Sequence, residues 1–320
     1  MLEAEVNKFT HDAVVADVSE THIRFAVVHT DRLTIEDYVQ FGKNVFGSVV
    51  EALAAYRRSL PTCPPALGIT IANSELLPVS DLERRLAEGH AGEWHHIQII
   101  GSIDALSLIL PDLAPHDVVQ FGGAEARRDA AKAVASIGDA LGVGVLAQIN
   151  GSCPQFHAHA GSISFAPRTQ EELDILERIR CDTDHVSVEH VLSDRGLAHL
   201  YQILRESSGQ PVRSLQATDI VIAGLQGDDR CATTAINYFA TWLGRFAGDM
   251  ALLYDARGGV YLWGPILRKM EKLLHNGAFR LAFEAKGRRS DWLTRIPVFL
   301  IRSEDAILRG AAKALNQQMD

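Results

Sequence analysis

The sequence predicts an α/β protein of two domains, and three observations support this fold class. The chain has 320 residues, a length that corresponds to about two domains with sizeable cores. Its composition, with 47% hydrophobic and 22% charged residues, is that of a globular protein. Short apolar segments typical of buried strands alternate with segments in which apolar residues recur every three or four positions, as in helices. Such alternation of strands and helices is typical of α/β architectures.

The first domain is expected over residues 1–110 and begins with a β-hairpin. The apolar segment 13–15 is followed by a polar turn and by a strand in which Ile23, Phe25 and Val27 alternate with other residues. Ser80 is expected to be the N-cap of a later helix. After the hairpin we expect a helix over 48–60, a strand over 66–72, a helix over 79–88, a strand over 95–100 and a helix over 104–109.

The second domain is expected over residues 111–302. Its longest predicted helix, over 231–253, is mostly apolar and is therefore expected at the centre of the domain. A last helix is predicted over 305–315. The segment 118–123 opens this domain. The other segments are predicted strands over 132–137, 144–149, 259–263 and 297–301, and predicted helices over 170–180 and 196–204.

Charge and cysteine content exclude several classes of protein. A formal net charge of −9 argues against nucleic-acid binding, which favours a basic surface. No apolar segment approaches the roughly 18 residues of a membrane span, and the N-terminus lacks the apolar core of a signal peptide. The cysteines form no C-x-x-C pair, which indicates a reducing compartment. We therefore expect a cytoplasmic protein with no membrane or nucleic-acid partner.

Several long segments resemble the bacterial ATP-dependent glucokinase family. They are VVQFGGAEA (118–126), SFAP (164–167), EHVLSDRGLAHLY (189–201), GRFAGDMAL (244–252) and FRLAFEAKGR…IPVFLI (279–301). The resemblance covers nearly the whole chain. It implies a two-domain actin-like ATPase (ribonuclease H-like) sugar-kinase fold, an active site in the cleft between the domains, and a homodimer. It also implies that the C-terminal helix, about residues 303–320, returns to the first domain.

The first phosphate-binding motif of this family is altered. Where family members have Asp-x-Gly-Gly-Thr-Asn, this chain has Asp17-Val-Ser-Glu-Thr-His22, so Asp17 and Thr21 remain and both glycines are lost. Glycine lets a backbone turn approach a phosphate closely, whereas Glu20 brings a like charge toward it. If no ligand binds, we expect Glu20 to pair with Arg24 instead.

Two further nucleotide-binding motifs are also altered. The second phosphate loop, Gly-Thr-Gly-Leu-Gly in the family, is Gly138-Asp-Ala-Leu-Gly142 here, and we expect Asp139 to pair with Lys132. The Gly-Gly on the adenosine side is Gly264-Pro265, and proline has no N–H to donate. We therefore expect a degenerate nucleotide site and no cofactor, with Mg-ATP bound only if the protein is an active kinase. The residues of this site are Asp17, Thr21, Gly138, Gly142 and Gly264.

The general base of the family has no direct counterpart. In family members a strand ends in Ile-Ile-Asn-Asp, and the Asp is the base toward the sugar 6-hydroxyl; here the aligned residues end in Gly101 and Ser102. A hydroxyl is a poor base near neutral pH, whereas a positioned base contributes roughly 10²–10⁴-fold to the rate. Asp104 is the candidate for a displaced base. The alternative is that Asp104 is a first-turn carboxylate stabilised by the helix dipole.

The sugar-binding residues of the family are largely replaced. The loop Glu-Gly-Gly-His-x-Asp reads His159-Ala-Gly-Ser-Ile-Ser164, and only Glu189 is retained among the sugar contacts. Glu189 is interpreted equally well as a structural carboxylate. Cys153, His157 and His159 have a spacing that could hold a metal, but they lack a fourth ligand, so no metal is expected. The candidates for substrate binding are Glu189, His159 and Gly101.

These changes support two hypotheses about function. The first is a pseudoenzyme that keeps the sugar-kinase scaffold, has lost glucose phosphorylation, and binds a sugar or a regulatory protein. The second is an active ATP-dependent sugar kinase that phosphorylates the 6-hydroxyl of a hexose with a rebuilt site, using Asp104 and Glu189.

Overall fold

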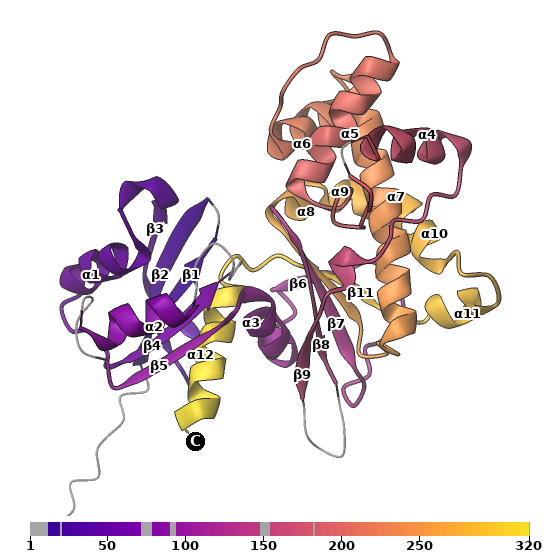
Figure 1. Cartoon of the computed structure of the whole chain (residues 1–320). Coiled ribbons are helices and arrows are strands. Elements are labelled where there is room, and N and C mark those ends of the chain that lie inside the picture. The colour runs from indigo at the N-terminus through magenta and orange to yellow at the C-terminus, as the bar shows by residue number, and fades with distance from the viewer. Residues whose placement is uncertain are drawn as a thin grey trace, which may run out of the picture. The chain divides into compact units, whose positions relative to one another are not determined.

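The computed structural model describes residues 12–19, 21–71, 79–89, 94–147, 154–181 and 183–319. The chain forms two compact units, each with its own sheet (Figure 1). The first unit comprises Met1–Leu110 together with Glu304–Asp320, and the second comprises Pro111–Ser303. The C-terminal helix α12 (Ala306–Met319) therefore belongs to the first unit, where it packs against α3 (Ser102–Ile109).

The first unit contains a five-stranded mixed sheet in the order β3-β2-β1-β4-β5. Because successive side chains of a strand point to opposite faces, strands β1 and β2 contribute to a core on both sides of the sheet. Val14 and Ala16 belong to the core formed with α1 and α2, whereas Val15 packs with α12 on the opposite face. Its strands are β1 (Asp12–Val18), β2 (His22–His29), β3 (Thr34–Gly42), β4 (Ala66–Ile71) and β5 (His96–Gly101), and its other helices are α1 (Val49–Ser59) and α2 (Val79–Ala87).

The second unit contains a six-stranded sheet in the order β6-β11-β10-β7-β8-β9. Its central strands β7, β10 and β11 run parallel, and the other pairings are antiparallel. The strands are β6 (Val118–Gln120), β7 (Lys132–Ile137), β8 (Leu141–Leu146), β9 (Gln155–Ala158), β10 (Val260–Trp263) and β11 (Val298–Ile301). The helices are α4 (Gln170–Ile179), α5 (Asp194–Ser207), α6 (Ala217–Gln226), α7 (Arg230–Leu253), α8 (Pro265–Lys269), α9 (Glu271–His275), α10 (Ala278–Glu284) and α11 (Ser290–Leu293).

Helix α7 is the central element of the second unit. Asp229 caps it by accepting from the backbone N–H groups of Cys231 and Ala232, which would otherwise lack partners. Gly244 and Gly248 allow α10 to pack directly against α7, because a Cβ at either position would collide with a backbone carbonyl of α10. As the sequence predicts, this long apolar helix contributes many residues to the core.

Several elements differ from those expected. Helix α3 begins at Ser102 rather than at residue 104, and Ser80 lies inside α2 rather than capping it. Strand β8 begins at Leu141, so Gly142 lies in the strand, where it pairs with Ser136 of β7, and not in a turn. Strands β3 and β9 and helix α6 were not anticipated. The α/β fold class itself is confirmed.

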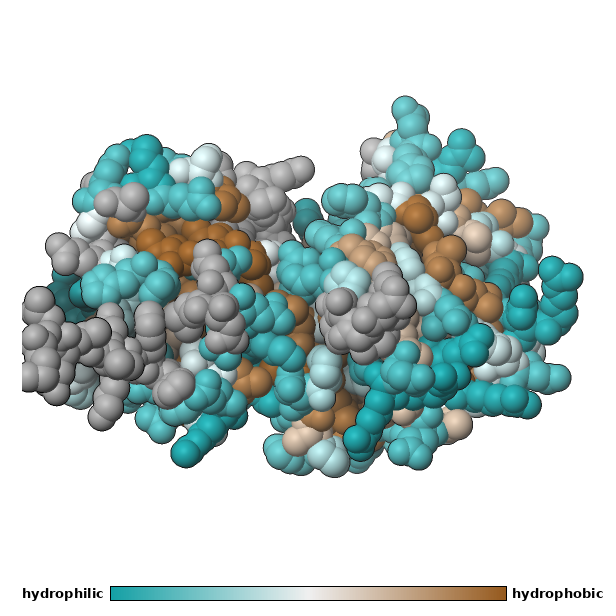
Figure 2. Space-filling view, turned by 90° about the horizontal axis from the view of Figure 1, so that it is seen from below, coloured by the Kyte–Doolittle hydropathy of each residue, from teal (hydrophilic) through white to brown (hydrophobic). Residues whose placement is uncertain are grey.

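Figure 2 shows hydrophobic residues among hydrophilic ones on this face of both units. Some large apolar side chains are exposed, among them Val45, Leu253 and Leu281. Isolated exposed apolar residues are normal for a globular protein and need no special account. Among the helices that the structure describes, none is long and apolar enough to cross a membrane.

Candidate functional site

A buried ion pair lies at the end of the first hairpin. Asp17 of β1 and Arg24 of β2 face each other across the antiparallel pair, and their residues are 2% and 6% exposed. The Nε of Arg24 donates to Oδ2 of Asp17 at 3.0 Å, and Nη2 donates to the same oxygen. The remaining guanidinium nitrogen, Nη1, donates to the backbone carbonyl of Glu304 at 2.7 Å. Glu20, the expected partner of Arg24, lies outside the described residues, and the Arg24 guanidinium bonds Asp17.

The second carboxylate oxygen of Asp17 is also fully engaged. The hydroxyl of Thr70 on β4 donates to Oδ1 at 2.8 Å, and the hydroxyl of Ser102 donates to the same oxygen at 3.2 Å. Asp17 thus accepts four hydrogen bonds from groups on β2, β4 and α3. Arg24 balances the negative charge of Asp17. The Ser102 hydroxyl therefore acts as a donor to a carboxylate oxygen in this contact.

Asp104 lies in the same first turn of α3 as Ser102. A Cβ built on Gly101, the N-cap residue, would lie 2.8 Å from Oδ2 of Asp104, so the carboxylate occupies the space beside the glycine. This is the position from which a carboxylate in the third residue of a helix reaches back toward its N-terminus, where the helix dipole stabilises it. The absence of a side chain at Gly101 is what makes room for this arrangement.

The turn that contains Thr21 is closed by its own side chains. The Ser19 hydroxyl oxygen accepts from the backbone N–H groups of Thr21 at 3.3 Å and of His22 at 3.1 Å. The hydroxyl of Thr21 lies 3.0 Å from Nδ1 of His22, and the Ser19 N–H donates to the His22 carbonyl. The N–H groups of Ser19, Thr21 and His22, which are the described ones of this turn, therefore already have acceptors within the protein.

The second expected phosphate loop is a tight turn between β7 and β8. The N–H of Gly138 donates to the carbonyl of Ala140 at 3.1 Å, and the Gly138 carbonyl accepts from the N–H of Asp194 at 2.7 Å. Lys132 begins β7 and Asp139 follows its other end, which places them about 20 Å apart along the strand. The expected pairing of Lys132 with Asp139 is therefore wrong.

Asp194, the first residue of α5, adds a second carboxylate near this turn. Burial and, to a smaller degree, the charge of Asp139 raise the pKa of Asp194 from 3.8 to about 6. The Oδ1 atom of Asp194 is buried without a hydrogen-bond partner among the described residues. The two acids lie where the family motif has a phosphate-binding loop, and Nη2 of Arg195 donates to the Asp139 carbonyl there at 3.4 Å.

Glu189 connects the turn to the loop that follows β9. Its Oε2 accepts from the N–H of Leu141 at 2.9 Å, and its own N–H donates to the carbonyl of Gly161 at 3.0 Å. A Cβ at Gly161 would lie 2.5 Å from the Leu141 carbonyl, so glycine is required for this contact. Three segments, over 138–142, 159–164 and 186–192, are therefore in direct contact.

His159 is exposed and stacks on His157, with ring centroids 5.0 Å apart. Cys153, the third member of the metal pattern considered above, lies outside the described residues. Within the described part of the chain, no group of three or more His, Cys, Asp or Glu side chains is placed to hold a metal ion.

Gly264 lies at the end of β10, at the junction with α8. A Cβ at this position would collide with the backbone carbonyl of Ile137 on β7, so the glycine permits close packing of two strand ends. Pro265 occupies the first position of α8, which removes one backbone donor at that end. The indole Nε1 of the preceding Trp263 is buried and has no hydrogen-bond partner among the described residues.

A family model described as Glucokinase matches residues 14–318 of this chain. The chain belongs to the glucokinase family. It is 30% identical over 324 residues to the glucokinase of Cronobacter sakazakii, covering 97% of this chain and 98% of that protein. It is 34% identical over 322 residues to the glucokinase of an Enterobacter species, covering 97% and 98%.

Solved glucokinases have the same fold. A crystal structure of glucokinase from an Antarctic psychrotroph superposes with a TM-score of 0.80 at 27% identity, covering 96% of this chain and 99% of that one. A ROK-family glucokinase from Streptomyces griseus, solved with glucose and AMPPNP, superposes with a TM-score of 0.67 at 18% identity, covering 96% and 99%, which shows the fold alone. The actin-like sugar-kinase fold implied by the sequence resemblance is confirmed.

The glucokinase motif positions fall into two groups, one in each unit. The first group contains Asp17, Gly101, Ser102 and Asp104, and the second contains Gly138 and Glu189. The sequence reading missed Thr70, Asp194 and the Glu304 carbonyl. Thr70 was detectable as a polar residue in the apolar segment ALGITI. Asp194 follows the N-cap Ser193, and an acid in the first turn of a helix is so common that it gives no signal of a site.

Proposed function

We propose that this glucokinase-family protein has lost glucose phosphorylation and uses the sugar-kinase scaffold for binding or regulation. The observation that carries the proposal is the hydrogen bond from Ser102, at the position of the family's base, to the buried Asp17. A serine hydroxyl used as a donor cannot take a proton from a sugar hydroxyl. Losing a positioned general base alone lowers the rate roughly 10²–10⁴-fold.

The surroundings of both phosphate motifs support the loss of nucleotide binding. Catalysis of phosphoryl transfer rests on backbone donors and Mg²⁺ arranged around the phosphates. In the first turn the N–H groups of Thr21 and His22 bond Ser19, and near the second turn Asp139 and Asp194 carry negative charge. Opposing a polyanion with carboxylates costs several kcal/mol.

The sugar-binding side supports the same proposal. His159, Ser162 and Ser164 replace two carboxylates and a histidine of the family loop and are exposed. Glu189 remains, but one of its oxygens bonds the N–H of Leu141 within the protein. Fewer charged acceptors are therefore left to hold sugar hydroxyls.

One observation favours the second candidate function, an active hexose kinase. The carboxylate of Asp104 lies beside Gly101. Gly101 directly precedes Ser102, which is at the position of the family's base. A base supplied from this side of the strand end would compensate for Ser102. The pseudoenzyme would show no hexose-dependent turnover, whereas the active kinase would show turnover that requires Asp104.

The test is ADP formation from MgATP by the purified protein with a panel of hexoses, compared with a hexose-free blank. We expect background rates for the native chain and for Ser102→Asp, because the sugar and the nucleotide would still be poorly held. Turnover that is abolished by Asp104→Asn, but not by Asp112→Asn on the exposed turn after α3, would establish the kinase instead. Millimolar MgATP should cause no thermal shift, and a micromolar Kd for ATP would contradict the proposal.

We further propose that the protein acts as a homodimer in the cytoplasm, in line with its family membership and acidic charge. Sedimentation equilibrium of the full chain tests the oligomeric state, and a monomer across the micromolar range would reject it.

A further inference from the structure

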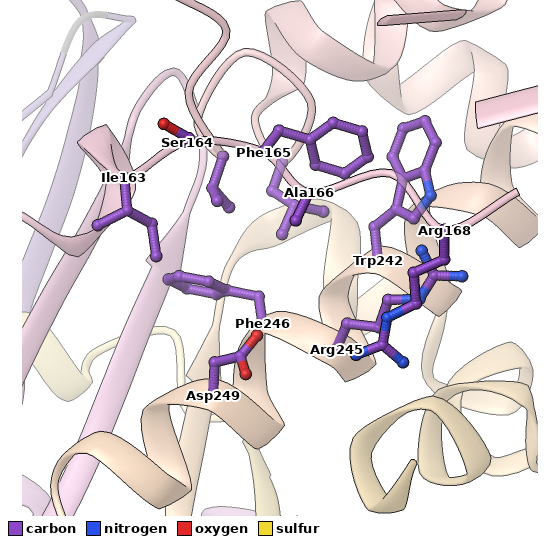
Figure 3. A pocket seen from close by; sticks show the side chains of 11 residues that line it. Ile163, Ser164, Phe165, Ala166, Arg168, Trp242, Arg245, Phe246 and Asp249 are labelled. Atoms are coloured by element: carbon purple, nitrogen blue, oxygen red, sulfur yellow. The ribbon is translucent and has the colours of Figure 1, made fainter. Parts of the chain in front are cut away.

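A pocket of about 80 Å³ opens in the second unit, next to the segment that follows the His159 loop. Aromatic side chains form much of its wall: Phe165 from the loop segment, and Trp242 and Phe246 from α7 (Figure 3). The rest of the apolar wall consists of Ile163, Ala166, Val188 and Leu192. Most of these lining residues belong to segments that carry the family resemblance, 164–167, 189–201 and 244–252, but no role has been assigned to them above.

Arg168 and Arg245 lie close to each other at the Trp242 side of the pocket (Figure 3). Arg245 has a carboxylate partner, because its Nη1 bonds Oε2 of the buried Glu172 at 2.6 Å. Glu172 also accepts from the Trp242 indole at 3.1 Å and from the backbone N–H of Arg168 at 2.6 Å. Its charge is therefore fully used within the protein, and it anchors Trp242 and Arg245 in the wall.

The side chain of Arg168 has a different environment. Its Nη1 donates to the backbone carbonyl of Ala285 at 3.2 Å, and no carboxylate in the described part of the chain pairs with its guanidinium. The other acid of the pocket, Asp249, forms an ion pair with Lys286.

The charged residues that line the pocket are Arg168, Arg245 and Asp249, while Glu172 and Lys286 pair with Arg245 and Asp249. Burial lowers the pKa of Lys286, and the nearby charges of Arg168 and Arg245 lower it further, whereas Asp249 opposes the shift. Burial is the largest cause of this lowered pKa, and the two arginines contribute less to it than Asp249 does in the opposite direction. An anion placed beside Arg168 would give its guanidinium a charged partner.

The chemistry of the walls narrows the class of ligand. A guanidinium matches a carboxylate or phosphate through its fork of N–H donors, and aromatic walls favour a flat apolar body. Most lining residues are apolar, so a polyhydroxylated ligand would leave many hydroxyls without partners. We propose that this pocket binds a small carboxylate with a flat apolar body, its carboxylate on Arg168 and its ring against Phe165, Trp242 and Phe246.

Titration calorimetry with the full chain tests the proposal with four probes. Benzoate carries both the charge and the ring, benzyl alcohol carries the ring alone, inorganic phosphate carries charge alone, and glucose 6-phosphate carries charge on a polar body. We expect benzoate to bind at millimolar concentrations or below and the other three to bind at least about tenfold more weakly, since the lost interaction is a charge-assisted hydrogen bond or the apolar contact. This test does not depend on whether the protein phosphorylates a sugar.

Two variants locate the site. Arg168→Gln should weaken benzoate binding at least about tenfold, whereas Arg213→Gln, at an exposed arginine of the same unit away from the pocket, should leave it unchanged. Ala166→Phe, at an exposed position of the lining, should block the pocket. Melting temperatures equal to that of the native chain verify folding. The proposal is overturned by no binding of benzoate, by equal binding of phosphate or benzyl alcohol, by tighter binding of glucose 6-phosphate, or by unchanged affinity in Arg168→Gln.

Discussion

Replacing Arg24 with leucine should destabilise the first unit by about 3–5 kcal/mol. The substitution removes both hydrogen bonds to Oδ2 of Asp17 and the bond to the Glu304 carbonyl, yet it leaves Asp17 only 2% exposed. Breaking one side of a buried ion pair costs roughly 3–5 kcal/mol, because the remaining charge is uncompensated. The hydroxyls of Thr70 and Ser102 still donate to Oδ1, but neither carries a charge.

The measurement is chemical denaturation combined with hydrogen exchange of peptides from β1 and β2, which reports on the first unit separately from the second. Arg127→Leu is the matched control, because Arg127 pairs with Asp129 on the surface, with side chains 55% and 72% exposed. Exposed pairs contribute roughly 0–1 kcal/mol, so this control should have little effect.

The double variant Asp17→Leu, Arg24→Leu isolates the interaction between the two residues. Because apolar replacement of a whole buried pair is often close to neutral, the double variant should be more stable than Arg24→Leu alone. A loss below about 1 kcal/mol in Arg24→Leu would show that the pair is not excluded from water. Asp17 would then not be a structural carboxylate, and the account of Ser102 as its donor would fail with it.

The other predictions concern the second unit. Asp194→Asn should stabilise the protein by up to about 3 kcal/mol near pH 8 and leave its stability unchanged near pH 4. The reason is that the pKa of Asp194 is raised from 3.8 to about 6 in the folded protein. The native chain therefore has its full stability below pH 3.8 and loses this contribution as pH rises through about 6, whereas Asn does not ionise. Thermal melts across pH check this, and Asp219→Asn, exposed in the first turn of α6, should show no such trend. Gly244→Ala should cost about 1–3 kcal/mol in urea unfolding, because its Cβ would collide with α10. Glu189→Ala should speed amide exchange at Leu141 about tenfold, since that N–H loses its acceptor; unchanged exchange would contradict the assigned bond.

The strands and helices that sequence patterns predicted well are those with a clear apolar period. Helix α7 is buried along most of its length, and β1 contains the apolar segment 13–16, so both were recognised. Strand β3 was missed because its burial is shallow throughout and Asp37 has a positive φ near a register shift, so it lacks a regular alternation. Gly142 was misplaced because a glycine inside a strand and a glycine in a turn look alike in sequence.

The site was less predictable, because its contacts join residues that are far apart in the chain. Asp17 was recognised from its motif, but its partners Thr70 and Ser102 lie 53 and 85 positions away. The carbonyl of Glu304, which bonds Arg24, lies 280 positions away and carries no side-chain signal at all. Sequence reasoning identified which motif residues had changed, and only the fold shows what the remaining ones now contact.

Several polar groups at the altered motifs are satisfied by the protein itself, whereas Oδ1 of Asp194 and Nε1 of Trp263 are buried without a partner among the described residues. Asp17 accepts four hydrogen bonds from its own unit, Ser19 accepts from the N–H groups of Thr21 and His22, and Glu189 accepts from the N–H of Leu141. A buried polar group without a partner costs roughly 1–3 kcal/mol, so a site that waits for a ligand holds such groups at the expense of stability. Here a ligand would have to displace internal bonds before it gained its own. Restoring one family residue therefore adds one contact while the internal bonds remain, which is why we expect Ser102→Asp alone to fail.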